Sequence, residues 1–260
     1  MSCKNNVPYG TGPSRDEIGA LEAKINYTPT RVPDSVITRA IPILQFFKGK
    51  APAEFGLAVA GVWGCESGID STRYNKGEQS NGGRVNGVTT STNTFTYKGT
   101  KYEKTEETMR KFGYGKGLAQ WTWDRPLKFR DWYNGGGVPT PSLPTMDENA
   151  SAITATSVST QTAFAWVEMQ ERSGEFMNTV NNITHVDHKT KTEEYKENIK
   201  KCVDAVTRGF ENGSKAKFAN VSDMNRYSGD YWGVDFKKRY EYAIGIYEKI
   251  KDNPDYQQYL

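Results

Sequence analysis

Glu66 is the residue whose position in this sequence is best suited to acid–base chemistry. It follows the apolar segment 55–65, FGLAVAGVWGC, and precedes Ser67 and Gly68. Burial disfavours the charged form of a carboxyl group, and the partial negative charge at a helix C-terminus acts in the same direction. Both effects predict a Glu66 side chain that stays protonated near neutral pH, as a general acid must. The alternative is that Glu66 is simply the first exposed residue after a helix.

The segment before Glu66 is expected to form a buried helix. Pro52 suits a first helical turn, the residues after it are apolar on every side, and Gly68 can end the helix. Three glycines within the segment each weaken a helix by about 1 kcal/mol relative to Ala. We therefore expect Gly56, Gly61 and Gly64 to allow close packing of neighbouring helices.

Apolar residues spaced three or four apart predict further helices. The predicted ranges are 34–44, in which Pro42 should bend or end the helix, 126–132, 161–172, 193–211 and 234–251. Residues 94–102 alternate around Lys98-Gly99, which predicts a β-hairpin. The expected fold class is therefore mainly α, of the α+β type, with a small β-hairpin lobe inserted after the helix of Glu66.

The expected domain organisation is one large domain with two appendages. Pro-rich residues 1–33 are expected to form an extended arm, residues 34–252 the domain, and residues 253–260 a C-terminal tail. A stretch rich in Gly, Pro, Ser and Thr at 134–160 is expected to be a flexible loop inside the domain.

Composition and charge argue against several classes of function. The 34 basic and 31 acidic residues leave a net charge of +3 without a Lys/Arg-rich run, so nucleic-acid binding is not expected. The N-terminus lacks the apolar stretch of a signal peptide, and no stretch approaches the length of a membrane span. We therefore expect a protein made in a cytoplasm, without export by a signal peptide and without membrane insertion.

Other reactive residues make weaker candidates. His185 and His188, the two histidines of the chain, form a poor metal site with Asp187, so no metal and no cofactor is expected. Cys65 lies on the apolar helix, where a free thiol usually behaves as a small buried hydrophobe. The sequence has no P-loop and no GxGxxG segment that opens a helix.

Two segments together resemble the phage tail lysozyme family, which is similar to goose-type lysozymes and soluble lytic transglycosylases. They are AGVWGCESGI at 60–69 and GLAQWTWDR at 117–125, and VTRGFEN at 206–212 is a weaker third match. The resemblance covers residues 34–250. It implies a lysozyme-like fold and an enzyme that cuts peptidoglycan between N-acetylmuramic acid and N-acetylglucosamine by general acid catalysis.

The resemblance also implies roles for individual residues. Glu66 matches the catalytic acid, and Gly117, Leu118 and Gln120 match a segment that lines the substrate cleft. Gln120 would hydrogen-bond the N-acetyl sugar or hold the Glu66 side chain. The stretch between Glu66 and Gln120 is longer than the family pattern, which we attribute to an inserted hairpin region.

The aromatic end of the second segment carries further expectations. Trp121 would form a wall of the cleft, and Trp123 would be either a core residue or a platform for a sugar ring. Asp124 and Arg125 match the end of the segment, where an ion pair that braces the loop is favoured over a catalytic role.

A second carboxylate would decide the reaction. A hydrolase usually positions a base that activates water, whereas a lytic transglycosylase lets the substrate's own hydroxyl attack. Asp70, Glu78 and Asp124 are the candidates, and Asp70 follows Glu66 closely enough to face the same cleft. Both reactions stay open at this stage.

The place of action follows from the resemblance together with the absence of a signal peptide. A virion component and a holin-released endolysin both fit, and the lack of a visible wall-binding repeat favours the virion. The arm at 1–33 would then attach the enzyme to other tail proteins.

The competing interpretation is an inactive tail protein, structural or glycan-binding, with the shape of a lysozyme. It predicts that Glu66 is exposed and dispensable. We favour the enzyme, because a binding module does not need a protonated carboxyl group at the end of an apolar helix.

Overall fold

The computed structural model describes residues 32–75, 94–103, 105, 115–122, 124–137, 151–172, 174–211 and 236–260. The N-terminal arm predicted at 1–33 lies almost entirely outside the described residues, as do Glu78, Trp123 and much of the loop predicted at 134–160.

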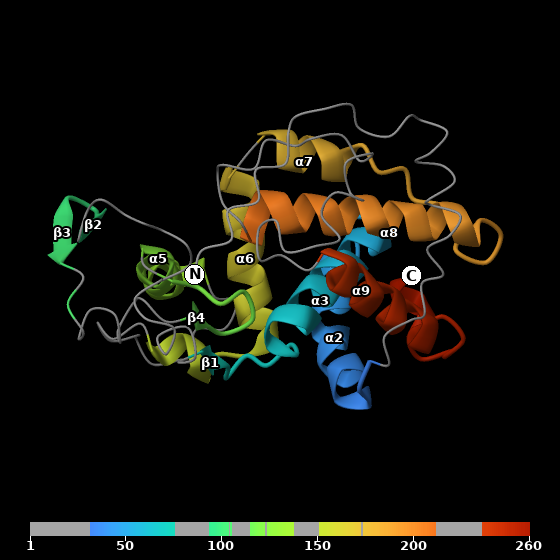
Figure 1. Ribbon diagram of the computed structural model, residues 1–260, viewed down its shortest axis with the longest axis horizontal. Helices are drawn as coiled ribbons and strands as arrows, with labels where there is room; N and C mark the ends of the chain where they lie inside the picture. Colours follow the sequence, from blue (N-terminus) through green and yellow to red (C-terminus); the bar gives the residue numbers. More distant parts are fainter. Residues whose placement is uncertain are drawn as a thin grey trace, which may run out of the picture.

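Helices make up most of the described structure (Figure 1). They are α2 (Asp34–Phe47), α3 (Ala53–Ser67), α5 (Asp124–Trp132), α6 (Val158–Arg172), α7 (Gly174–Asn181), α8 (Thr192–Val206) and α9 (Phe236–Ile250). Short turns of 3-10 or π helix occupy Tyr133–Gly137, Ser151–Ala155, Thr207–Glu211 and Gln257–Tyr259.

The described strands are short and pair in antiparallel fashion. β1 (Tyr74–Asn75) pairs with β4 (Gly115–Lys116), and β2 (Thr94–Tyr97) pairs with β3 (Thr100–Glu103). The predicted fold class, mainly α with a small β-hairpin inserted after the helix of Glu66, is therefore confirmed.

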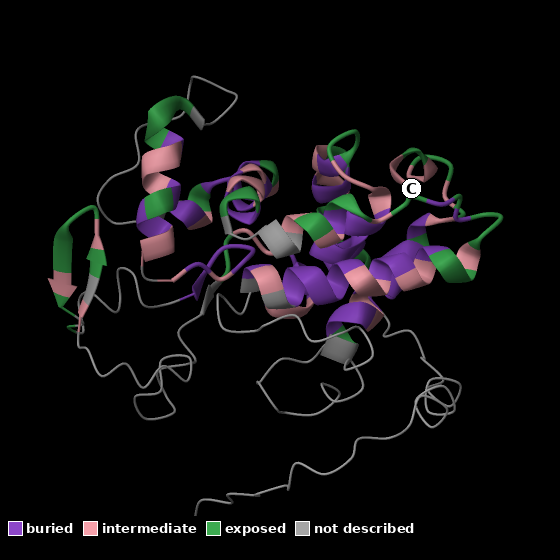
Figure 2. Ribbon diagram, turned by 90° about the horizontal axis from the view of Figure 1, so that it is seen from above, coloured by how far each residue is buried: buried purple, intermediate pink, exposed green. Residues whose placement is uncertain are grey.

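Helix α3 forms the centre of the hydrophobic core. Its side chains are buried from Glu54 through Trp63, and it packs against α2, α8 and α9. Figure 2 shows the neighbouring helix α8 buried along most of its length. A helix that is apolar on all sides requires neighbours on all sides, and this surrounding shell of helices meets the requirement.

Glycines let α3 and α9 approach closely, as the sequence predicts. A Cβ atom added at Gly61 would lie 2.6 Å from both the backbone N and the Cα of Ala243. One added at Gly64 would lie 2.8 Å from the Cδ1 atom of Tyr242. The missing side chains of Gly61 and Gly64 therefore set the spacing of these two helices, with the backbone of α9 closest at Gly61.

Two local expectations differ from the structure. Helix α2 runs through Pro42 without ending, because the flanking Ile43 and Leu44 are anchored in the core. Helix α7 follows α6 closely and was not predicted from the sequence.

The predicted hairpin is present and packs against α5. Lys98 and Gly99 form its turn with φ values of 46° and 80°, a combination typical of a tight two-residue turn. The Tyr97 hydroxyl donates a hydrogen bond to Asp131 of α5 at 2.8 Å, and the Lys98 ammonium pairs with the same carboxylate at 2.6 Å. Asp131 therefore links the hairpin to the helical part.

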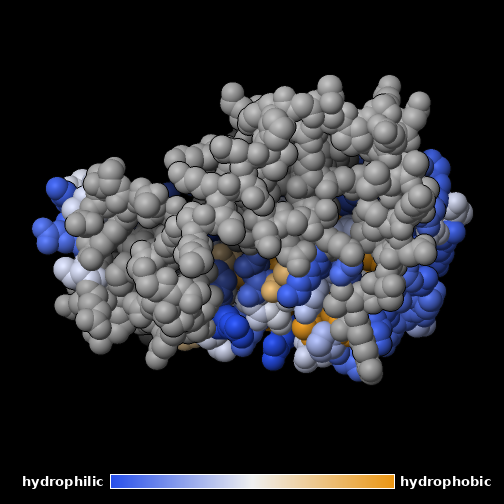
Figure 3. Space-filling model, viewed as in Figure 1, coloured by the Kyte–Doolittle hydropathy of each residue, from blue (hydrophilic) through white to orange (hydrophobic). Residues whose placement is uncertain are grey.

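The described residues that reach the surface include both hydrophilic and a smaller number of hydrophobic ones (Figure 3). Among the helices that the structure describes, none is both long and apolar enough to cross a membrane.

Replacing Gly61 by Ala should destabilise the protein. Alanine favours a helix by about 1 kcal/mol over glycine, but its Cβ would collide with the backbone of α9 and cost about 1–3 kcal/mol or more. Urea unfolding measures the difference. Gly135→Ala is the control, because an added Cβ there meets nothing within 4 Å. A Gly61→Ala variant at least as stable as wild type would contradict the backbone contact.

Asp131→Asn should remove an acid-dependent part of the stability. Burial acts to raise the pKa of Asp131, but hydrogen bonds from Lys98, Arg130 and Tyr97 outweigh it and hold the pKa at about 2. Because this pKa is lower folded than unfolded, the stabilisation is complete above about pH 4 and is lost as the pH falls towards 2, by about 2 kcal/mol.

Unfolding free energies measured from pH 6 to pH 2 check this expectation. The advantage of the wild type over Asp131→Asn should shrink across the acid range. An advantage that stays constant with pH would show that the ionised carboxylate contributes nothing.

Candidate functional site

Glu66 lies on the last turn of α3, where the buried helix reaches the surface. Its side chain is 30% exposed, whereas Trp63 one turn earlier is fully buried. Gly68 ends the helix with a left-handed φ of 69°, as predicted. The N–H groups of Gly68 and Ile69 donate to the carbonyl groups of Gly64 and Trp63.

The residue that leads the chain away from the helix has an uncommon backbone conformation. Ile69 has a φ of 51°, which is rare for a β-branched residue, and its side chain is fully buried. Conformations of this kind cost about 1–3 kcal/mol and persist only where the surroundings impose them. Here the hydrogen bond to Trp63 and the core contacts of the side chain fix the path that follows Glu66.

The Glu66 carboxylate forms an ion pair with Arg239, a residue on the first turn of α9. The Nη2 atom of Arg239 donates to Oε1 of Glu66, and the arginine side chain is only 5% exposed. Successive contacts join Gly61 to Ala243, Gly64 to Tyr242, and Glu66 to Arg239. Helices α3 and α9 are therefore antiparallel, and their close approach brings the guanidinium to the end of α3.

The surroundings of Glu66 differ from the expected ones. The helix alone gives Glu66 apolar neighbours, whereas the fold adds the guanidinium of Arg239, a charged hydrogen-bond donor. The sequence analysis considered only the helix that carries Glu66 and did not identify Arg239 as its partner. A basic residue at a helix N-terminus is disfavoured by the helix dipole, so Arg239 in the first turn of α9 was a weak signal that went unused.

Asp70 lies in the loop directly after α3. Its Oδ1 atom accepts hydrogen bonds from the backbone N–H of Thr72 at 2.9 Å and from the Thr72 hydroxyl at 2.6 Å. Burial acts to raise the pKa of Asp70, but these hydrogen bonds and the charges of Arg39 and Arg73 outweigh it and lower the pKa. Asp70 is therefore ionised at neutral pH, on the segment that connects Glu66 to β1.

The second predicted segment joins this loop through β1 and β4. Tyr74 is opposite Lys116 and Asn75 is opposite Gly115, and the Gly117 N–H donates to the carbonyl of Arg73 at 2.9 Å. Figure 1 shows β1 and β4 together beyond the end of α3. Two segments that are far apart in the sequence are thus hydrogen-bonded neighbours in the fold.

Gln161 of α6 ties these segments together, and the sequence analysis did not identify it. Its side chain is fully buried. The Oε1 atom accepts from the Leu118 N–H at 2.8 Å, and Nε2 donates to the carbonyls of Ser71 at 3.0 Å and Ile153 at 2.8 Å. One amide therefore connects the loop after Glu66 to the loop of Leu118.

Trp121 does not form a cleft wall as expected, because its side chain is fully buried. Its indole N–H donates to Oε2 of Glu168 at 2.7 Å, and its ring packs against Phe129 and Phe164. Leu118 is likewise buried in the core. Both side chains therefore anchor the loop in the core and are not available to contact a substrate.

Gln120 is partly exposed, and its backbone is left-handed with a φ of 47°. Its Nε2 atom donates to the carbonyl of Gly117 at 2.7 Å. Its Oε1 atom is buried and has no hydrogen-bond partner within the described part of the chain. The amide of Gln120 is therefore held by its nitrogen alone.

The predicted ion pair between Asp124 and Arg125 is not formed. Arg125 instead binds Glu168 of α6 through two hydrogen bonds, of 3.1 and 3.0 Å, and Asp124 pairs with Lys128 at 2.9 Å on the exposed side of α5. The loop is braced, as expected, but the partner comes from another helix. Gln161 and Glu168 lie on one face of α6 and hold the two ends of the segment.

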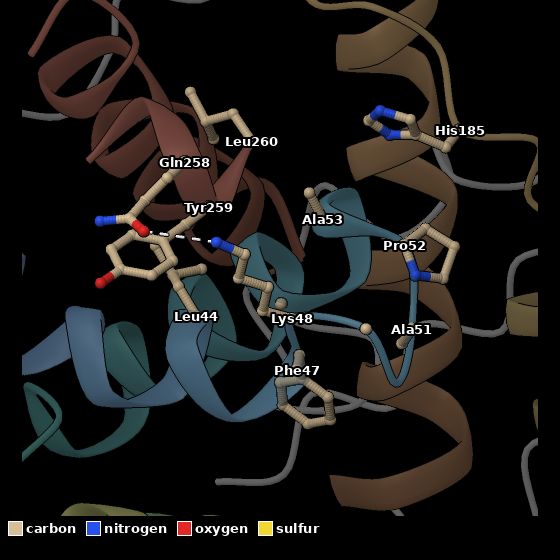
Figure 4. A pocket seen from close by; sticks show the side chains of 12 residues that line it. Leu44, Phe47, Lys48, Ala51, Pro52, Ala53, His185, Gln258, Tyr259 and Leu260 are labelled. Atoms are coloured by element: carbon tan, nitrogen blue, oxygen red, sulfur yellow. Dashed lines mark hydrogen bonds between the residues drawn. The ribbon is translucent and has the colours of Figure 1, made fainter. Parts of the chain in front are cut away.

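Figure 4 shows a pocket of about 380 Å³ at the opposite end of α3. It is lined by the end of α2, by Pro52, by His185 and by residues 258–260. Helix α3 has 15 residues; at about 1.5 Å per residue it separates this pocket from Glu66 by roughly 20 Å. The pocket therefore does not include Glu66.

The two histidines lie in different surroundings, His188 in the packed interior and His185 half-exposed beside Glu54. The buried Glu54 carboxylate accepts from His185 at 3.0 Å and from the Val186 N–H at 3.4 Å. His188 packs against the rings of Tyr195 and Tyr247. No cluster of potential metal ligands occurs among the described residues.

Gln161→Leu should destabilise the protein strongly. The substitution leaves the buried Leu118 N–H without its acceptor, which costs about 1–3 kcal/mol, and it removes the donor to the carbonyls of Ser71 and Ile153. Urea unfolding checks this, with Gln170→Leu as the control, because Gln170 is exposed on the same helix. Equal stability of the two variants would refute the role of Gln161 as a connector.

Comparison with known proteins adds independent information. No curated protein and no solved structure matches the chain. A family model described as phage tail lysozyme matches residues 42–250, which include α3, the loop of Gln120 and the first part of α9 that carries Arg239. The chain therefore belongs to the phage tail lysozyme family.

Proposed function

We propose that this protein is a muramidase that cuts the bond between N-acetylmuramic acid and N-acetylglucosamine in peptidoglycan, with Glu66 as the general acid. The observation that carries the proposal is the position of Glu66. It is a partly exposed carboxyl group at the end of the buried α3, on the segment to which the loop of Gln120 is hydrogen-bonded. Family membership supports a peptidoglycan-degrading role.

The reaction begins with proton transfer from Glu66 to the glycosidic oxygen. The bond between this oxygen and C1 of the muramyl residue breaks, the leaving sugar departs with a hydroxyl group, and positive charge develops at C1. An ionised Asp70 on the adjoining loop suits electrostatic stabilisation of that charge or activation of a water molecule. Gln120 is partly exposed on the adjoining loop, which suits contact with an acetamido substituent of the sugar.

Two outcomes of the second step are distinguishable. Attack of water at C1 gives a reducing end, whereas attack of the C6 hydroxyl of the muramyl residue gives an anhydro sugar. We favour hydrolysis, since Asp70 is a charged carboxylate within the same loop system. Asp124 is not proposed as the second carboxylate, because it faces Lys128 on the exposed side of α5.

We further propose that the enzyme acts as part of a phage tail during penetration of the cell wall. The family to which it belongs consists of tail lysozymes. In this proposal, residues 1–33 attach the enzyme to other proteins of the tail. An inactive glycan-binding tail protein is the second candidate, and the partial exposure of Glu66 is the observation in its favour.

Glu66→Gln should reduce the cleavage of purified peptidoglycan by about 10²–10⁴-fold, because a general acid contributes that much. Muropeptides identified by mass spectrometry are the readout, with reducing ends expected. Glu171→Gln, at an exposed position on α6, is the control and should retain full activity.

Three other results have separate meanings. Anhydro-muropeptides would replace the hydrolase by a lytic transglycosylase. Full activity of Glu66→Gln would remove Glu66 from the mechanism. A wild type that cleaves none of several wall types, yet binds them, would favour the glycan-binding protein.

A further inference from the structure

Arg239 differs from a structural arginine in the way it is paired. Arg125 and Glu168 are both largely buried, with side chains 12% and 5% exposed, and two nitrogens contact two carboxylate oxygens. Arg239 is also buried, at 5%, but its partner Glu66 is 30% exposed and accepts through Oε1 alone. The pair therefore holds one oxygen of Glu66 inside the protein.

The remaining donors of Arg239 are idle. Its Nε and Nη1 atoms are buried and have no hydrogen-bond partner within the described residues. A buried guanidinium with unpaired donors is unfavourable, so a purely structural role would leave much of this cost uncompensated. The guanidinium therefore has free donors for a second carboxylate oxygen.

In the proposed reaction, Glu66 starts protonated and ends as a carboxylate. Because Arg239 contacts Oε1, the transferable proton belongs on Oε2, the oxygen that the guanidinium does not hold. As the proton moves to the glycosidic oxygen and the sugar–oxygen bond breaks, both oxygens of Glu66 come to share a full negative charge. A guanidinium binds such a carboxylate through two parallel hydrogen bonds, so one idle nitrogen can take the second oxygen.

We infer that Arg239 is the positioning residue of this site, which directs Oε2 of Glu66 towards the substrate and stabilises the carboxylate formed when the proton leaves. The inference rests on the proposed function, because it assigns Arg239 a part in the step that Glu66 performs. The close approach of α3 and α9 at Gly61 and Gly64 supplies the rigid spacing that such a contact needs.

The test is steady-state kinetics on soluble, uncross-linked peptidoglycan glycan chains of defined length. Arg239→Gln should lower kcat by about 10- to 100-fold with KM within about twofold of wild type, because the interaction is made in the transition state and not with bound substrate. Arg239→Lys keeps the positive charge but cannot donate two parallel hydrogen bonds, so it should recover part of kcat. Glu248→Gln is the control, since it breaks an ion pair of the same helix with Lys196 of α8.

A double-mutant cycle isolates the action through Glu66. If Arg239 acts only through that side chain, adding Arg239→Gln to Glu66→Gln should cause no further loss. Thermal unfolding of each variant is measured in parallel. If Arg239→Gln does not fold, Arg239→Lys carries the test, with a lower kcat and unchanged KM expected.

The failure of this inference is distinguishable from failure of the proposed function. Wild-type kcat in both Arg239 variants, or a raised KM with unchanged kcat, would overturn the inference while Glu66→Gln stays inactive. A further loss in the double variant would likewise show that Arg239 acts elsewhere. Full activity of Glu66→Gln would overturn the proposed role of Glu66 and this inference with it.

Discussion

The close antiparallel contact of α3 and α9 is the constraint on which the rest of the site depends. Backbone meets backbone at Gly61 and Ala243, so the helices cannot shift by small side-chain adjustments. This contact fixes the end of α3 relative to the first turn of α9, and with it the pairing of Glu66 and Arg239. An acid that must be aligned to within fractions of an ångström benefits from a rigid support of this kind.

A second set of contacts, from α6, joins the two halves of the site. Gln161 and Glu168 lie on one face of this helix. Gln161 accepts a hydrogen bond from the Leu118 N–H, and Glu168 binds Trp121 and Arg125. The hydrogen bond of Gln161 to Ser71 extends the support to the loop after Glu66. Buried polar groups thus fix the loop of Gln120. Its apolar side chains are buried in the core and are not available to a substrate.

Local features were predictable from the sequence, and partners from distant segments were not. Pro52, Gly68 and the Lys98-Gly99 turn act through the backbone of their own segments, and the structure has each in the predicted place. The role of Trp121 and the partner of Arg125 were not predicted, because Glu168 is remote in sequence. Arg239 and Gln161 were not identified for the same reason. Their hydrogen-bond partners lie on other segments, which come together only when the helices pack.

The measurement that tests this account most directly is the structure of Glu66→Gln in complex with a peptidoglycan tetrasaccharide. The account predicts a glycosidic oxygen within hydrogen-bonding distance of the side chain at position 66, and an acetamido group beside Gln120. A glycan bound away from position 66, for example in the pocket beside Pro52 and His185 at the other end of α3, would contradict it.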